Sequence, residues 1–129
     1  MRVFVLEDDE KRVEWINKNF DKRVKMDLVD TADDAINLLR NNKYDIIFLD
    51  HDLGGEQMVD SNYHNTGATV AKMIHETENK NSTVIVHSYN PIGANNMMSS
   101  MRDHKIKCHY CFFLGNEFKD VVRQMNEQS

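Results

Sequence analysis

Carboxylate and imidazole side chains stand directly after three short apolar runs of the sequence. They are Glu7 and Asp8, then Asp50, His51 and Asp52, and then His87. Carboxylate oxygens bind magnesium, calcium or manganese, and an added imidazole nitrogen also suits manganese, zinc or iron. If the apolar runs are parallel strands of one sheet, these side chains meet at one edge, because ligands bind at the carboxyl ends of such strands.

Three acids in one cleft repel one another, and a bound divalent cation relieves this repulsion. We therefore expect Glu7, Asp8 and Asp50 to hold a divalent metal ion, namely magnesium, manganese or zinc. The alternative is that these acids are solvated loop residues, as most surface carboxylates are. We favour the metal site because a parallel sheet would force the three acids together.

Two histidines are candidates for the same site. His87 follows an apolar run and stands where a strand ends, beside the expected acids. His64 lies in the polar, turn-rich segment 51–65, and long loops commonly carry lid or ligand residues. Either histidine can exchange a proton near neutral pH or bind the metal directly, and the sequence leaves these two roles open. His51 is a weaker candidate, because it would point away from Asp50 if the strand continued.

Apolar strand patterns alternate with helical patterns along the whole chain. Strands are expected within residues 2–10, 24–30, 44–50, 82–88 and 107–113. Helices are expected within residues 7–20, 31–42, 66–79, 90–104 and 115–128. The alternation predicts an α/β fold, in which helices cover both faces of a parallel sheet. Thr31 and Asn90 are the expected N-caps of two of the helices.

Length and composition fit a single domain over residues 1–129, with 40% apolar and 29% charged residues. No apolar run approaches the roughly 20 residues that cross a bilayer, so we expect a cytoplasmic protein without a membrane partner. The net charge of −5 disfavours long nucleic acid as a partner, because its binding depends on neutralising many backbone phosphates. A small phosphorylated ligand is compatible with this charge, since local charge decides its binding.

Four segments of the chain resemble the receiver domain of two-component response regulators. They are VFVLEDDE, DTADDAINLL, YDIIFLD and VIVHS. The resemblance covers essentially the whole chain and implies a five-stranded parallel sheet of order 2-1-3-4-5. Receivers carry an acidic pair that matches Glu7 and Asp8, and a phosphoacceptor aspartate that matches Asp50. They bind magnesium with these groups and with a backbone carbonyl at position 52, so Asp52 is also expected at the metal, through its carbonyl or its side chain.

Three departures from the receiver pattern fall at the expected site. Receivers have a threonine or serine after the fourth strand, where this chain has His87 followed by Ser88. Receivers have a lysine after the fifth strand, where this chain has Leu114. The loop after the third strand is longer and contains His64. The combination of the segment LDHDLGG, the loop that contains His64 and the histidine after the fourth strand resembles a receiver-like family described as cyclic-phosphate processing.

The second resemblance implies a metal-dependent phosphoesterase that opens a cyclic phosphate, in a nucleotide or at an RNA end. The metal would activate water and neutralise the phosphate, and a histidine would protonate the leaving oxygen. The catalytic candidates are His87, His64 and Asp50. The alternative is an atypical receiver that relays a signal or senses phosphate or nucleotides without hydrolysis. A metal-dependent phosphatase is a third reading, and the metal and the oligomeric state stay open.

Overall fold

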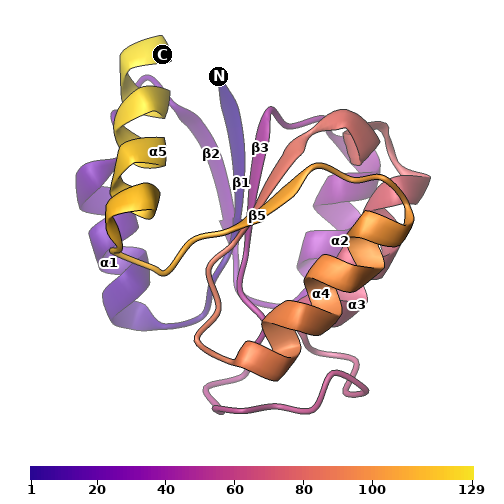
Figure 1. Cartoon of the computed structure of the whole chain (residues 1–129). Coiled ribbons are helices and arrows are strands. Elements are labelled where there is room, and N and C mark those ends of the chain that lie inside the picture. The colour runs from indigo at the N-terminus through magenta and orange to yellow at the C-terminus, as the bar shows by residue number, and fades with distance from the viewer.

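Five short strands form one parallel sheet in the computed structural model of residues 1–129 (Figure 1). They are β1 (Arg2–Leu6), β2 (Lys25–Val29), β3 (Ile46–Leu49), β4 (Thr83–Val86) and β5 (Cys108–Tyr110). The strands lie in the order β2-β1-β3-β4-β5, and every neighbouring pair is parallel. The α/β fold class and the strand order 2-1-3-4-5 are therefore confirmed.

Helices cover both faces of this sheet (Figure 1). They are α1 (Glu10–Asn19), α2 (Ala32–Asn41), α3 (Gly67–Met73), α4 (Pro91–Asp103) and α5 (Asn116–Gln128). α1 and α5 lie on one face, and α2, α3 and α4 lie on the other. Both predicted N-caps are confirmed: Thr31 accepts a hydrogen bond from the Asp34 N–H (3.2 Å), and Asn90 accepts one from the Gly93 N–H (2.9 Å). None of the helices has the length and apolar character needed to cross a membrane.

The helix expected within residues 66–79 is shorter than predicted. α3 ends at Met73, and two 3-10 turns follow it, η1 (Ile74–Glu76) and η2 (Glu78–Asn81). The side chain of Asn79 is fully buried at this point. It hydrogen-bonds to the backbone of Leu39, Asn42 and Tyr44. The turns thus bring the Asn79 side chain between the end of α2 and the start of β3, where it hydrogen-bonds to both segments.

The strand expected within residues 107–113 is also shorter than predicted, because the chain leaves the sheet after Tyr110. Phe113 is buried against α5 instead, with its ring 4.8 Å from that of Phe118. Leu114 then has a φ of 65°, which lies in the left-handed region and is incompatible with an extended strand.

Alternate residues of each strand face opposite layers of the molecule. Val3 and Val5 belong to the apolar cluster with α1 and α5, whereas Phe4 and Leu6 belong to the cluster with α2, α3 and α4. Burial on both faces explains why the strands are apolar almost throughout. The strands all end at one rim, at the bottom of Figure 1, where the loop of residues 50–66 projects beyond the sheet.

Candidate metal-binding site

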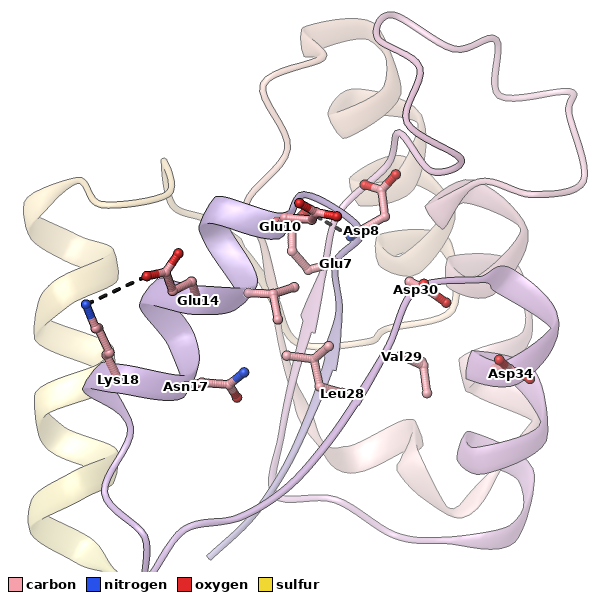
Figure 2. Close-up of a pocket in the computed structure, with 11 residues that line it drawn as sticks. Glu7, Asp8, Glu10, Glu14, Asn17, Lys18, Leu28, Val29, Asp30 and Asp34 are labelled. Carbon is pink, nitrogen blue, oxygen red and sulfur yellow. Dashed lines mark hydrogen bonds and ion pairs between the residues drawn. The ribbon is translucent and has the colours of Figure 1, made fainter.

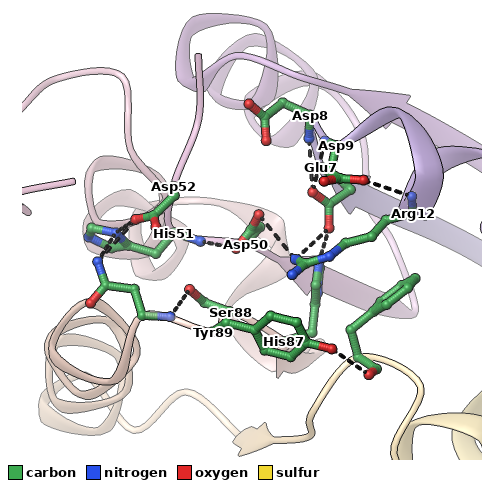
Figure 3. Close-up of polar contacts among 12 residues, drawn as sticks. Glu7, Asp8, Asp9, Arg12, Asp50, His51, Asp52, His87, Ser88 and Tyr89 are labelled. Atoms are coloured by element: carbon green, nitrogen blue, oxygen red, sulfur yellow. Dashed lines mark hydrogen bonds and ion pairs between the residues drawn. The ribbon is translucent and has the colours of Figure 1, made fainter. Parts of the chain in front are cut away.

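Three buried polar side chains meet at the rim where β1, β3 and β4 end (Figure 3). Glu7, Asp50 and His87 each follow a strand directly, and their backbone N–H groups still bond to the neighbouring strand at 3.0 or 3.1 Å. Their exposed fractions are 0%, 4% and 1%. One ligand atom from each lies within 4.8 Å of the other two, and His87 Nε2 is 3.0 Å from Glu7 Oε1. We call these three residues the rim cluster.

The two carboxyl groups of the rim cluster have pKa values shifted in opposite directions. Burial favours a raised pKa for Glu7, but the hydrogen bond and charge of His87, the Asp9 N–H and Arg12 together lower it. Burial raises the pKa of Asp50 to about 8, and the neighbouring Glu7 adds to the rise, although Arg12 opposes it. Two ionised carboxylates therefore coexist here only at a cost, which a divalent cation would remove.

His87 presents one nitrogen to the acids and buries the other. Its ring lies among Phe48, Phe113 and Phe118, with centroids 5.9 to 6.4 Å away. Nδ1 has no hydrogen-bond partner, so the contact with Glu7 is the ring's polar anchor. Two carboxylates and an imidazole nitrogen form a donor set that fits manganese, zinc or iron as well as magnesium.

Arg12 completes the surroundings of the rim cluster, although it is not among the site residues predicted from the sequence. Its Nη1 is 3.3 Å from Glu7 Oε1 and 3.6 Å from Asp50 Oδ2. The available sequence signal was the N-cap Asp9, which accepts hydrogen bonds from the Lys11 and Arg12 N–H groups. That cap places Arg12 in the first turn of α1, beside the end of β1.

A cleft of about 210 Å³ opens beside the rim cluster and gives solvent access to Asp50. Its lining includes Asp8, Arg12, Asp50, Glu56, Met58 and Tyr89. We call this hollow the central cleft. Asp8 lies on its wall, where Oδ2 accepts a hydrogen bond from the Gly55 N–H at 2.7 Å. Burial raises the pKa of Asp8, and the charge of Glu7 adds to this effect. Asp8 is therefore near the rim cluster but not one of its three members.

The Asp52 side chain organises the loop after β3 instead of reaching into the rim cluster. Its carboxylate accepts hydrogen bonds from the Met58 N–H (2.7 Å), the Val59 N–H (3.2 Å) and the Asn90 side chain (3.0 Å). It also pairs with His51 Nδ1 at 2.8 Å. Asp52 lines the central cleft, but the structure does not bring its carboxylate into the rim cluster, and the loop and Asn90 supply its hydrogen-bond donors.

His51 is fully buried and belongs to the same loop network. Its Nε2 lies 2.8 Å from the hydroxyl of Ser61, so both ring nitrogens have partners. The ring also packs against Gly93 of α4, where a Cβ atom would lie only 2.4 Å from the imidazole. His51 therefore fixes the loop onto α4 and lies outside the rim cluster.

His64 lies apart from the rim cluster. Its side chain is 65% exposed, and Nε2 is 2.6 Å from Asp33 Oδ1 at the start of α2. The structure therefore does not bring His64 to Asp50, as the catalytic assignment required. The position of His64 in a loop did not indicate where its side chain would point. In the structure its partner is Asp33, an exposed acid of α2.

A second hollow, the groove between α1 and β2, is lined by Glu7 and Asp8 among others (Figure 2) and shares Asp8 with the central cleft. It measures about 700 Å³, and its lining includes Glu10, Glu14, Lys18, Leu28, Asp30 and Asp34. Lys18 is its one cationic residue and pairs with Glu14 at 3.7 Å. This groove is therefore a poor place for an anion, whereas the central cleft holds Arg12 beside Asp50.

Known receiver structures share this fold. The receiver domain of a Francisella response regulator is 20% identical, with a TM-score of 0.65, and the match covers 98% of this chain and 97% of that one. The response regulator TrrA from Thermotoga maritima, in complex with Mg²⁺-BeF, is 17% identical, with a TM-score of 0.64 and coverage of 96% and 97%. The receiver domain of a Pseudomonas aeruginosa sensor histidine kinase, with magnesium in its active-site cleft, is 15% identical, with a TM-score of 0.67 and coverage of 98% and 97%.

These similarities establish the receiver fold, and a sequence family narrows the assignment. A search of curated protein sequences gives no match. The family described as "Cyclic-phosphate processing Receiver domain" matches residues 1–103, which include β1 to β4 and the whole rim cluster. The chain therefore belongs to the family of cyclic-phosphate processing receiver domains.

Proposed function

We propose that this chain is a metal-dependent phosphoesterase that opens a cyclic phosphate, in a nucleotide or at an RNA end. The observation that carries the proposal is the rim cluster, where a histidine occupies the position of a receiver's hydroxyl residue, 3.0 Å from Glu7. When bound, a divalent ion at this cluster would neutralise charge on the phosphate and lower the pKa of a water molecule. Manganese and zinc suit the mixed oxygen and nitrogen donors.

We assign Glu7, Asp50 and His87 as the metal ligands. His87 is 1% exposed and does not line the central cleft, so it has no direct path to a substrate. Its Nε2 faces Glu7, and its other nitrogen is enclosed by aromatic rings. The role of proton donor to a leaving group, open at the sequence level, is therefore less suitable for His87 than the role of ligand.

A small nucleotide is the substrate class that we favour over long RNA. The central cleft, of about 210 Å³, is large enough for a phosphate and part of a sugar. The surrounding acids and the net charge of −5 oppose a long polyanion. A cyclic mononucleotide presents a single negative charge, which one metal ion and the guanidinium of Arg12 can balance.

The test is turnover of 2′,3′- and 3′,5′-cyclic nucleotides by the purified protein with manganese, zinc or magnesium. We expect metal-dependent ring opening, detected by phosphorus NMR, and its loss in Asp50→Ala and His87→Ala. Asp33→Ala, which changes an exposed acid outside the cluster, serves as the matched control. If metal-loaded protein opens none of these rings, the proposal is wrong.

A second candidate is an atypical receiver that is phosphorylated on Asp50 without hydrolysing a cyclic phosphate. It is favoured by the position of Asp50, which lies directly after β3 and lines the central cleft. Against it stands Leu114, which gives β5 no cation at the position of the receiver lysine. Incubation with acetyl phosphate and magnesium, followed by mass spectrometry, tests for an Asp50 acyl phosphate.

A further inference from the structure

The central cleft takes its cation from a helix, not from the strand that supplies one in receivers. Its lining contains several acids but only one cationic side chain, that of Arg12. The segment after β5 offers Phe112, Phe113 and Leu114, none of which carries a charge. An anionic ligand in the central cleft would therefore meet Arg12 as the only positive group of the protein.

Arg12 is held in place by aromatic rings as well as by acids. Its guanidinium lies 4.3 Å from the centroid of the Tyr89 ring and 5.3 Å from that of Phe113. The hydroxyl of Tyr89 donates a hydrogen bond to the carbonyl of Phe113 at 2.9 Å, which fixes the ring beneath the guanidinium. Stacking of this kind orients a planar guanidinium and leaves its edges free to donate hydrogen bonds.

Most of the donors of Arg12 have no partner in the protein. A guanidinium carries five N–H donors, and Nη1 is the nitrogen that contacts Glu7 and Asp50. Nε and Nη2 make no hydrogen bond or ion pair, and the side chain is 18% exposed. An arginine that is fixed, lines a cleft and retains free donors is suited to bind a phosphate with two parallel hydrogen bonds.

We propose that Arg12, stacked on Tyr89, is the phosphate-binding residue of the central cleft and takes the place of the missing receiver lysine. The inference rests on the proposed function, because it concerns the phosphoryl group of the same ligand. The ligand class is a phosphate monoester or diester, held at Asp50 and the metal, and inorganic phosphate serves as its probe.

Arg12 and a metal ion at the rim cluster share the same two carboxylates. A metal ion that neutralises Glu7 and Asp50 weakens their attraction for the guanidinium and leaves Arg12 for the phosphate. Removing Arg12 should therefore affect the two ligands in opposite ways. Metal binding should hold or strengthen, because a competing cation is gone, whereas phosphate binding should weaken. A purely structural role for Arg12 would not separate the two.

The experiment measures Mn²⁺ binding by electron paramagnetic resonance and then the binding of inorganic phosphate to the manganese-loaded protein by calorimetry. We expect Arg12→Ala to bind phosphate at least about tenfold more weakly, the loss expected for a charge-assisted hydrogen bond, with an unchanged or tighter Kd for Mn²⁺. Arg12→Lys keeps the charge but loses the fork, so its phosphate affinity should be intermediate. Arg23→Ala, at an exposed arginine paired with Asp21, is the matched control.

The stacking partner gives a second set of variants that leave the arginine in place. Tyr89→Leu removes the ring beneath the guanidinium and should weaken phosphate binding about threefold. Tyr89→Phe keeps the ring and should bind phosphate nearly as the parent does. These variants and Arg12→Lys keep the test decisive if Arg12→Ala fails to fold.

Three results would overturn the proposal: no phosphate binding by the parent protein, unchanged phosphate affinity in folded Arg12 variants, or equal loss of Mn²⁺ and phosphate. None of these measurements requires turnover. Phosphate binding that depends on Arg12, without ring opening of any cyclic nucleotide, would support this inference while sinking the proposed function. Ring opening with an unchanged KM in Arg12→Ala would do the reverse.

Discussion

Asp50 and Asp52 are two residues apart in the chain, yet their carboxyl groups experience opposite surroundings. Asp50 accepts one hydrogen bond, from the His51 N–H at 2.8 Å, and faces Glu7 across the rim cluster. Asp52 accepts hydrogen bonds from two backbone N–H groups and one amide, and pairs with an imidazole. Burial and a like charge raise the pKa of Asp50. Burial also acts on Asp52, but its donors outweigh it and lower the pKa.

The two buried histidines repeat this contrast. Both ring nitrogens of His51 have polar partners, in Asp52 and Ser61. His87 has one, Glu7, and its other nitrogen is unpaired among aromatic rings. Residue type therefore does not separate a candidate ligand site from a structural network. The two groups differ in hydrogen-bond satisfaction: the loop network is complete by itself, whereas the rim cluster leaves His87 Nδ1 unpaired and holds two carboxyl groups that repel each other when both are ionised.

The largest effect should come from removing a member of the rim cluster. Asp50→Ala and His87→Ala should each weaken Mn²⁺ binding about 100-fold or more, because one of three donors is lost. Asp52→Ala, measured on its folded fraction, should change the Kd for Mn²⁺ by less than about threefold. Titration followed by electron paramagnetic resonance measures all three. Equal losses in the Asp50 and Asp52 variants would erase the distinction between the two regions.

The next effect concerns stability and should show the opposite ranking. Asp52→Ala should lower the free energy of unfolding by about 2 kcal/mol, because it leaves buried or partly buried donors without an acceptor. Asp60→Ala is the control in the same loop, since Asp60 is exposed and accepts one local hydrogen bond, from the Asn62 N–H. Its effect should be below about 0.5 kcal/mol. Urea denaturation measures both, and similar losses in the two variants would contradict the assigned role of Asp52.

The opposite pKa shifts predict opposite pH dependences for the metal-free protein. The carboxyl group of Asp50 ionises near its ordinary value of 3.8 when unfolded but keeps its proton up to about pH 8 when folded. Its presence therefore lowers stability progressively as the pH rises through that window. Asp50→Asn should thus raise the free energy of unfolding more at pH 8.5 than at pH 5. The difference should be at least about 1.4 kcal/mol, which corresponds to one pKa unit.

Asp52→Asn is the control for this pH dependence. The lowered pKa of Asp52 confers stability that is present above its ordinary value of 3.8 and is lost only as the pH falls below it. Its substitution should therefore change stability by the same amount at pH 5 and pH 8.5. Urea midpoints with a chelator present measure both variants. A pH-independent effect of Asp50→Asn would mean that neither burial nor the charge of Glu7 raises the pKa of Asp50.

The sequence predicted the strand alternation and the rim residues because both depend on local pattern. A parallel strand buried on both faces is an apolar run, and the residue after it must stand at the rim. Glu7, Asp50 and His87 follow directly from this rule once the strand order is given. The same rule failed at residues 111–113, which are apolar but lie outside the sheet. Phe113 packs against Phe118 of α5, and an apolar run does not distinguish a strand from a coil segment that is buried in this way.

Side-chain directions outside the strands were not predictable. Asn79 bonds to residues 35 to 40 positions away, so its place in the turn sequence gave no sign of its burial. Arg12 reaches the rim from a helix, and only the cap at Asp9 pointed to its location. Asp52 and His64 lie in a loop, where hydrogen bonds decide which way each side chain faces. Some of these bonds reach distant residues, namely Asn90 for Asp52 and Asp33 for His64, so the sequence did not predict whether either side chain reaches the site.

The smallest effect should come from His64, the second histidine of the predicted site. Its contact with Asp33 is an exposed ion pair, with side chains 65% and 81% accessible, and such pairs contribute about 0 to 1 kcal/mol. His64→Ala should therefore change the free energy of unfolding by less than about 0.5 kcal/mol and leave the Kd for Mn²⁺ unchanged. Asp33→Ala should match it closely, because each variant breaks the same pair. If His64→Ala abolished ring opening while Asp33→Ala did not, the loop would have to move His64 to the central cleft during the reaction. The division between a reactive rim and a structural loop would then be wrong at this residue.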